Sequence, residues 1–264
     1  MGLMSKHIAP LFGVWRMDES VEELLALLDC PEEQADFLRR VTAEGRRRER
    51  LASRVLLKQL LGKEPQVDYR PTGAPFLVDQ PLYVSISHTR GYAAAILSEA
   101  PTGIDIEYRA DRVLRIRSRF MTPEEERGID PAHEVEHLLL HWCAKETLFK
   151  IIGQEEVDFL THLHVHPFPY AEQGRFQVSE SRTPQAQSFR LAYQITTDYV
   201  LTWLSEGEAH LVPGHAAVGG AGEALVEVAE AGVEGNLGFL AGEDDSLTAV
   251  GLGIGNEAAH HKTG

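Results

Sequence analysis

The sequence predicts an α+β fold that consists of two successive halves. Two observations lead to this class. Segments with apolar residues three and four positions apart, the period of a helix, are interspersed with short segments in which apolar and polar residues alternate, the period of a strand. In addition, helices precede strands both before and after residue 100, which favours a duplicated α+β unit.

The composition is that of a globular protein with a substantial core, since 43% of the 264 residues are hydrophobic. The segment Met1 to Met17 lacks the long apolar stretch of a cleavable signal, and no window approaches the length of a membrane span. Only Cys30 and Cys143 are present, so a disulfide framework is not indicated. We therefore expect a cytoplasmic protein with reduced thiols and no membrane partner.

The formal net charge of -15 is unevenly distributed along the chain. Residues 205–264 hold ten Asp and Glu against one lysine, which gives -9 and leaves -6 for residues 1–204. The same segment is rich in Gly and Ala. We expect an N-terminal half at 1–100, a C-terminal half at 101–206, and an acidic tail at 207–264 that is flexible or weakly ordered.

The first half begins with a strand and continues with three helices and three more strands. Asp18, Glu19 and Ser20 form a helix start, and Gly62 is suited to end the third helix. The expected helices are Val21–Leu28, Ala35–Val41 and Arg46–Leu61, and the expected strands are Gly13–Arg16, Gln66–Tyr69, Leu82–Ser87 and Tyr92–Leu97. The third helix has leucines on its inner face and a charged outer face made of Arg47, Arg50, Arg54 and Lys58.

The second half contains a long helix between short elements. Thr122 and Glu125 form a capping box with Pro123 at the first helical position, so a helix starts there. The other expected helices are Arg112–Arg119 and Glu134–Ile152, and the expected strands are Gly103–Glu107, Phe159–His166, Arg175–Ser179, Phe189–Thr196 and Tyr199–Leu204.

Three carboxylates occur where burial makes them costly. The segment Gly103–Glu107 follows the apolar run Tyr92–Leu97 across a turn, so we interpret it as the return strand of a hairpin, and strand alternation puts Asp105 and Glu107 on one face. Glu146 interrupts the apolar stripe of the long helix. That stripe consists of Val135, Leu139, Trp142 and Phe149. Carboxylates buried together must be neutralised, paired or bound to a cation, and a divalent ion would serve all three.

Simpler explanations exist for each of these residues taken alone. Asp105 and Glu107 could line the solvent face of a strand. Glu146 and Lys150 could form a helical i, i+4 ion pair, worth about 0.3–0.5 kcal/mol. Taken separately, these simpler explanations are favoured, and the metal interpretation is preferred only together with the motif spacing described next.

With these residues the chain resembles the 4'-phosphopantetheinyl transferases, specifically the longer monomeric type that activates carrier proteins like those of surfactin synthetase. Gly103–Glu107 fits the GxDxE strand motif of that family, Trp142–Lys150 fits its WxxKExxxK helix motif, and Ser85–Thr89 is similar to its SxSH element. The resemblance covers residues 12–205, and three motifs in order make it specific. It implies a pseudo-duplicated fold with the active site in the cleft between two similar halves.

The resemblance also implies a reaction and the residues that perform it. Asp105, Glu107 and Glu146 would bind Mg2+, which holds the diphosphate of the co-substrate coenzyme A. Glu146 would take a proton from a serine of an apo acyl or peptidyl carrier protein, and Lys150 would stabilise the departing phosphate. The products are the phosphopantetheinylated carrier and adenosine 3',5'-bisphosphate.

Contacts to the nucleotide end of coenzyme A are implied as well. Ser87 and His88 look like the family's contacts to the 3'-phosphate, assisted by an arginine among Arg46 to Arg50, for which we choose Arg48. The chain departs from the family at Ala74, where a lysine is usual. Its affinity for coenzyme A is then reduced, or Arg70 or Arg90 substitutes for that lysine.

The basic helix at Arg112 to Arg119 is a candidate dock for an acidic helix of the carrier protein, with Arg115 and Arg117 as the test residues. A chain that holds both halves needs no second copy to complete the site. We therefore expect a monomer.

Two other classes of function remain open on the sequence. His133 and His137 match the HExxH pattern of zinc hydrolases, with His141 as a possible third ligand, although their positions on the helix predict that they face solvent. The Arg46–Lys58 helix could instead belong to a non-catalytic binding module.

Two further patterns are weaker signals. His162, His164 and His166 alternate on one strand face, as in a metal site, but a polar outer face opposite Leu163 and Val165 explains them equally well. The run Arg46 to Arg50 lacks interleaved aromatic residues, so we expect no nucleic-acid partner.

Overall fold

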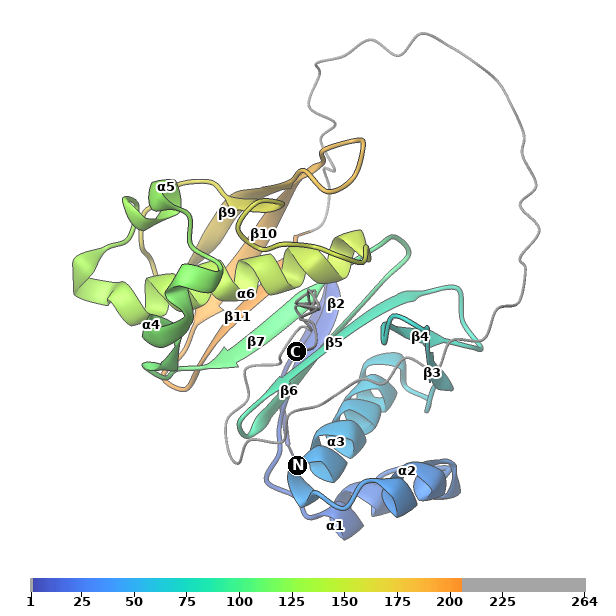
Figure 1. The fold of residues 1–264 in the computed structure, drawn as a ribbon. Helices are drawn as coiled ribbons and strands as arrows, with labels where there is room; N and C mark the ends of the chain where they lie inside the picture. The colour runs from blue at the N-terminus through green and yellow to red at the C-terminus, as the bar shows by residue number, and fades with distance from the viewer. Residues whose placement is uncertain (1, 206–264) are drawn as a thin grey trace, which may run out of the picture.

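The computed structural model describes residues 2–205, and the predicted acidic tail at 207–264 lies outside this range. Two antiparallel sheets lie next to each other, and each carries one long helix (Figure 1). The predicted α+β class is therefore confirmed. The similarity of the two halves stays a prediction.

The first sheet has four strands in the order β1-β2-β6-β5. Their bounds are β1 Leu3–Ile8, β2 Leu11–Arg16, β5 Tyr83–Thr89 and β6 Tyr92–Ser98. Helix α3 (Glu44–Leu61) covers one face of this sheet, with α1 (Val21–Ala26) packed against it and α2 (Ala35–Arg40) nearby (Figure 1). A separate hairpin, β3 (Val67–Tyr69) and β4 (Pro75–Leu77), follows α3.

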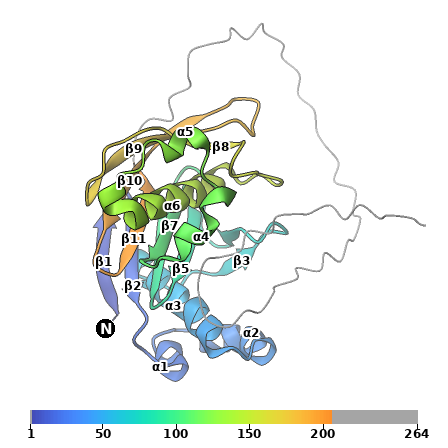
Figure 2. The same ribbon diagram turned by 60° about the vertical axis from the view of Figure 1, so that its left-hand side comes forward.

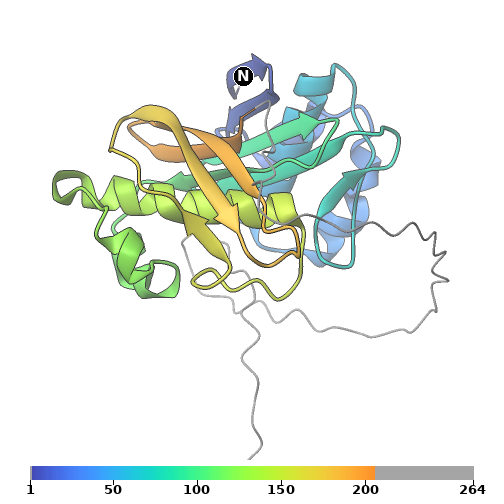
Figure 3. The same ribbon diagram turned by 90° about the horizontal axis from the view of Figure 1, so that it is seen from above.

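The second sheet has five strands in the order β7-β11-β10-β9-β8. Their bounds are β7 Ile104–Tyr108, β8 Leu163–Val165, β9 Gln173–Glu180, β10 Ser188–Ile195 and β11 Tyr199–Leu204. Helix α6 (Glu134–Ile152) lies along this sheet (Figure 2) and is crossed by its yellow and orange strands when seen from above (Figure 3). The short helices α4 (Arg112–Ile116) and α5 (Pro123–Glu126) precede α6.

Local signals explain where the helices start and end. Ser20 caps α1 and Thr122 caps α5, each in a reciprocal capping box with the glutamate three residues on. Helix α3 ends at Gly62, whose φ of 75° is the left-handed conformation that favours glycine. These boundaries agree with the sequence analysis.

Apolar residues fill three regions. One lies between α3 and the first sheet, and another between α6 and the second sheet. The third lies between the two sheets, where Phe12 and Val14 of β2 meet Ile104 and Ile106 of β7. Because neighbouring residues of β2 point to opposite faces, Trp15 contributes to the first region and Phe12 to the third.

Several predicted strands differ from the observed ones. The predicted hairpin between Tyr92–Leu97 and Gly103–Glu107 is wrong, because β7 pairs with β11 of the second sheet and not with β6. The predicted strand Phe159–His166 is reduced to Leu163–Val165. Strand β5 extends to Thr89, so His88 lies within a strand and not after it. Strands β1 and β4 were not predicted.

Among residues 2–205, no helix has both the length and the apolar character that crossing a membrane requires.

Candidate active site

The site is built where the two sheets meet, at the outer edges of β5 and β7. Strand β7 is an edge strand, so the N–H groups on its outer side have no strand to pair with. Three side chains at alternate positions of β5 accept these hydrogen bonds. The pairs are Ile104 N to Ser85 Oγ at 3.3 Å, Ile106 N to Ser87 Oγ at 3.4 Å, and Tyr108 N to Thr89 Oγ1 at 2.9 Å. This hydroxyl ladder fixes β7 against the first sheet.

Helix α6 packs against β7 and its partner β11, and Gly103 allows the helix to come close. A Cβ atom at Gly103 would lie 2.5 Å from the carbonyl oxygen of Thr147 and 2.8 Å from a side-chain carbon of Ile151. Only glycine fits this approach without a shift of the helix. The glycine of the strand motif therefore brings the carboxylates of β7 next to α6.

Asp105 is held by donors from two elements. Ser87 Oγ of β5 donates to Asp105 Oδ1 at 2.7 Å, and Lys150 Nζ of α6 donates to the same oxygen at 2.7 Å. The thiol of Cys143 lies 3.1 Å from Asp105 Oδ2. Asp105 is 1% exposed, so its charge is balanced by these groups and not by solvent.

Glu107 shares the buried surroundings of Asp105. Its Oε1 accepts a hydrogen bond of 2.8 Å from Trp142 Nε1. Burial raises the pKa of Glu107 well above its ordinary value, and the charges of Asp105 and Glu146 raise it further, although Trp142 and Lys150 oppose this.

Glu146 lies on α6 one turn before Lys150 and is 2% exposed. Its Oε1 is buried and has no hydrogen-bond partner. Burial, followed by the charge of Asp105, raises the pKa of Glu146 to about 8, while Lys150 lowers it. A buried carboxyl with one free oxygen and a raised pKa is unusual outside functional sites.

The donor set fits a hard divalent cation, since it offers carboxylate oxygens and excess negative charge. The three carboxylates are close enough that each of Glu107 and Glu146 is affected by the charge of Asp105. In the described part of the chain, however, no three His, Cys, Asp or Glu side chains are placed so that they could hold one ion together. Mg2+ does not require such a cage, because it commonly binds through one or two carboxylates together with waters and substrate phosphates.

The three residues predicted to contact coenzyme A, His88, Ser87 and Arg48, differ in whether they have free donors. His88 is on β5, where its Nδ1 is buried 3.6 Å from Glu49 Oε2, beyond hydrogen-bonding range. Burial lowers the pKa of His88, although the charge of Glu49 opposes the shift. Ser87, as described, is bonded to Asp105. Arg48 donates to the carbonyl oxygens of Glu19 and Met17 and so holds the start of α1.

Arg54 was missed as a candidate. Its spacing predicts a place on the charged outer face of the helix, but it is 2% exposed, and its Nη2 donates to the Tyr69 hydroxyl at 3.2 Å. Its Nη1 is buried without a partner. Arg50, one turn earlier, lies over the Phe37 ring at 4.4 Å, and burial followed by the charge of Arg54 lowers its pKa. An uncompensated arginine donor of this kind suits an anion.

The lysine within the helix motif, Lys145, has a structural place. It is fully buried on the side of α6 away from Asp105, and its Nζ donates to Glu125 Oε2 at 2.9 Å and to the carbonyl oxygens of Phe120 and Phe159. Glu125 in turn accepts from the Val165 N–H. This pair connects α5, α6 and β8.

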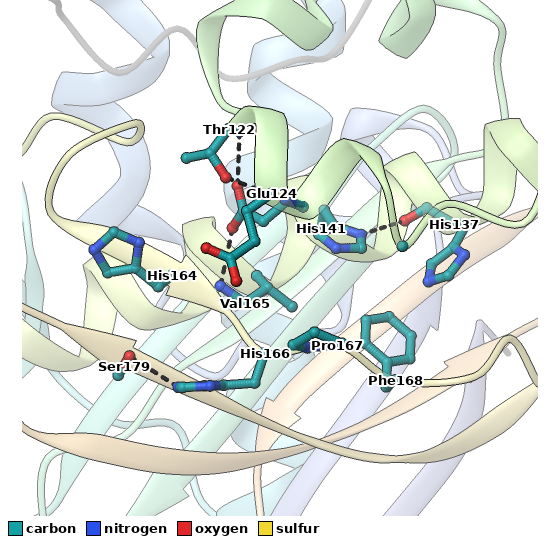
Figure 4. Close-up of a pocket in the computed structure, with 12 residues that line it drawn as sticks. Thr122, Glu124, His137, His141, His164, Val165, His166, Pro167, Phe168 and Ser179 are labelled. Carbon is teal, nitrogen blue, oxygen red and sulfur yellow. Dashed lines mark hydrogen bonds between the residues drawn. The ribbon is translucent and has the colours of Figure 1, made fainter.

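Of the two histidines of the HExxH pattern, His133 is exposed as expected, but the expectation is wrong for His137. His137 and His141 are buried, and both line a cavity of about 300 Å³ between α5, α6 and β8 (Figure 4). His137 Nδ1 accepts from the Asp130 N–H, which leaves the proton on Nε2, and His141 Nδ1 bonds the His137 carbonyl oxygen. His133 stacks on Tyr170 instead. The zinc interpretation therefore has no assembled ligand set among residues 2–205.

Two other sequence expectations concern the alternating histidines around Leu163 and the missing lysine at Ala74. Leu163 and Val165 are buried as predicted, and of the alternating histidines His162 accepts from the Asp158 N–H while His166 bonds Ser179. Ala74 is exposed in the β3–β4 turn. Arg70 and Arg90, the proposed substitutes for the missing lysine, lie over the rings of Phe76 and Tyr108.

The site is thus a buried acidic cluster between the edge strand β7 and helix α6, held in place by the hydroxyl ladder. Its carboxylates are of the kind that bind a divalent cation. The model of the 4'-phosphopantetheinyl transferase superfamily matches residues 101–204. Residues 101–204 therefore form a domain of this superfamily, in agreement with the two motifs at Gly103–Glu107 and Trp142–Lys150. The match includes β7 and α6 but not β5, which supplies Ser87 and His88. Comparison with curated proteins gave no match.

Proposed function

We propose that the protein transfers the 4'-phosphopantetheine group from coenzyme A to a serine of an apo acyl or peptidyl carrier protein in a Mg2+-dependent reaction. The observation that carries the proposal is the free, buried oxygen of Glu146 beside Asp105, within a domain of the transferase superfamily.

Asp105, Glu107 and Glu146 would hold the Mg2+ ion. The bound ion supplies positive charge to the diphosphate of coenzyme A and to the charge that develops during transfer. A cation beside Glu146 also lowers the pKa of this carboxyl, so that it can act as a base near neutral pH.

Glu146 then removes the proton from the hydroxyl of the carrier serine, directly or through one water. The serine oxygen forms a bond to the β-phosphorus of coenzyme A, and the bond from that phosphorus to the bridging oxygen breaks. The leaving group is adenosine 3',5'-bisphosphate. Lys150, whose Nζ is next to Asp105, stabilises the departing phosphate.

Coenzyme A would be recognised by basic groups near β5 and α3. His88 has a nitrogen without a hydrogen-bond partner, and Arg54 Nη1 has none either, whereas the donors of Arg48 are bonded to carbonyl oxygens. We therefore favour Arg54 over Arg48 as the arginine that contacts phosphate. Such a buried guanidinium is pre-organised for an anion.

The carrier protein would dock at α4 and the turn that follows it. Arg115 and Arg119 are exposed there. Arg117 forms ion pairs with Glu126 and Glu134, so its charge is already used within the protein. Arg115 is consequently the better test residue for an acidic partner.

The direct test is mass spectrometry of an apo carrier protein after incubation with coenzyme A and Mg2+. A mass gain of one phosphopantetheine group, with release of adenosine 3',5'-bisphosphate, supports the proposal. The Glu146→Gln variant is the negative control and should leave the carrier unmodified. Absence of transfer to acyl and peptidyl carriers alike would refute the function.

A further inference from the structure

The carboxylate of Asp105 is almost saturated with protein donors. An ionised carboxylate has about four acceptor positions. Ser87 Oγ and Lys150 Nζ, both 2.7 Å from Oδ1, and Cys143 Sγ, 3.1 Å from Oδ2, account for three of them. The remaining position has a fixed direction, because donors from β5 and α6 prevent the carboxylate from turning.

Ser87 has no donor left for a phosphate group. A serine hydroxyl has one hydrogen, and a phosphate oxygen can only accept. In Ser87 that hydrogen points to Asp105 Oδ1, while the hydroxyl oxygen accepts from the Ile106 N–H at 3.4 Å. The side chain is 5% exposed. This arrangement disagrees with a role of Ser87 in contacting the 3'-phosphate of coenzyme A.

Cys143 completes the support from the opposite side. It is fully buried in α6, and Asp105 Oδ2 is its nearer acceptor, since the carbonyl oxygen of Val200 is 3.6 Å away. A thiol has one weak S–H donor, and at this distance it is directed at the carboxylate.

We propose that Ser87 and Cys143 are positioning residues that fix Asp105 for the metal ion, and that Ser87 does not recognise coenzyme A. The inference rests on the proposed function for its consequence in transfer, but the positioning itself can be measured separately.

The experiment compares Ser87→Ala with wild type on coenzyme A and on dephospho-coenzyme A, which lacks the 3'-phosphate. Ser87→Ala removes a hydrogen bond to a charged group. This loss should reduce kcat, or raise the Mg2+ concentration that gives half-maximal activity, about tenfold. We expect the same factor with both substrates. If the factor disappears with dephospho-coenzyme A, Ser87 acts on the 3'-phosphate and the proposal is overturned.

Variants of Cys143 test the other support. Cys143→Ala should raise the half-saturating Mg2+ concentration, as Ser87→Ala does. Cys143→Ser should keep it near the wild-type value, because serine supplies a donor at the same place. Ser85→Ala is the matched control, since Ser85 Oγ also accepts from β7 but makes no bond to a carboxylate among those described. It should lower stability while wild-type Mg2+ half-saturation is retained.

A binding measurement separates this inference from the function. Mn2+ is titrated into the full chain with coenzyme A present, and the change in tryptophan fluorescence, to which Trp142 bonded to Glu107 contributes, reports the ion. Tight binding in wild type that is weakened in Ser87→Ala and Cys143→Ala supports positioning even if no carrier is modified. Equal binding in all three overturns positioning even if transfer occurs, and absence of binding in wild type overturns both.

Discussion

Lys150 Nζ donates to Asp105 Oδ1 at 2.7 Å and to the carbonyl oxygen of Ile104 at 3.1 Å, so one lysine of α6 bonds both the side chain and the backbone of β7. Its charge also lowers the pKa of Glu107 and of Glu146 against the effect of burial. Lys150 is therefore a counter-ion for the whole acidic cluster as well as the candidate that stabilises the leaving group.

Replacing Lys150 by methionine should abolish transfer and destabilise the fold. The substitution leaves Asp105, which is buried, without its cation, and such a loss costs about 2 kcal/mol for a lysine that is partly exposed. Chemical denaturation measures this loss. Mg2+ should recover part of the stability of Lys150→Met but little of that of Lys150→Arg, which keeps the charge. A methionine variant as stable as wild type would contradict the counter-ion role.

Gly103→Ala should separate β7 from α6. The new Cβ would lie 2.5 Å from the Thr147 carbonyl oxygen, and a shift of packed backbone costs about 2 kcal/mol. We expect lower stability and loss of metal-dependent transfer. Gly45→Ala, where a Cβ meets nothing within 4 Å, is the control; it should leave transfer unchanged and should not lower stability, since alanine favours helix α3. Equal behaviour of the two variants would show that the close approach is not required.

The local parts of this site could be predicted from the sequence, and the long-range parts could not. The bounds of α6 and the capping box at Thr122 follow from helical periodicity and local hydrogen bonds, and both agree with the structure. The partner of β7 does not follow from local pattern, because β11 is nearly a hundred residues further along the chain. The hairpin prediction failed for that reason.

Burial of polar residues was the other failure. Arg54 and His137 occupy positions that a single helix would expose, and they are buried only because Tyr69, the loop before α6 and β8 cover them. The role of Ser87 is similar. Its spacing from Ser85 and Thr89 is visible in the sequence, but the strand whose N–H groups these hydroxyls accept is known only from the fold.

Acid should destabilise the protein partly through His141. Burial lowers the pKa of His141 from 6.5 to about 4. Between these values the unfolded chain binds a proton that the folded chain does not, so stability is lost as pH falls through this window. The contribution is about 3 kcal/mol. Unfolding free energies at pH 7 and pH 4 should differ less in His141→Gln than in wild type, and an equal difference would contradict the assignment.

Two arginines of the proposed carrier dock should behave differently. Arg115→Glu should reduce kcat/KM for the carrier protein at low salt and leave the KM for coenzyme A unchanged, since Arg115 is exposed. Arg117→Glu should lower the melting temperature, because it breaks the ion pairs with Glu126 and Glu134. The dock is wrong if Arg115→Glu modifies the carrier at the wild-type rate under these conditions.

The central claim is that Asp105, Glu107 and Glu146 serve one divalent ion although the protein alone does not assemble them around it. The most direct measurement is the number of Mn2+ ions bound per chain in the presence of coenzyme A, by calorimetry or electron paramagnetic resonance. The account predicts one ion in wild type and strongly weakened binding in Asp105→Asn, Glu107→Gln and Glu146→Gln. Binding that persists in all three variants, or that is absent from wild type, would contradict it.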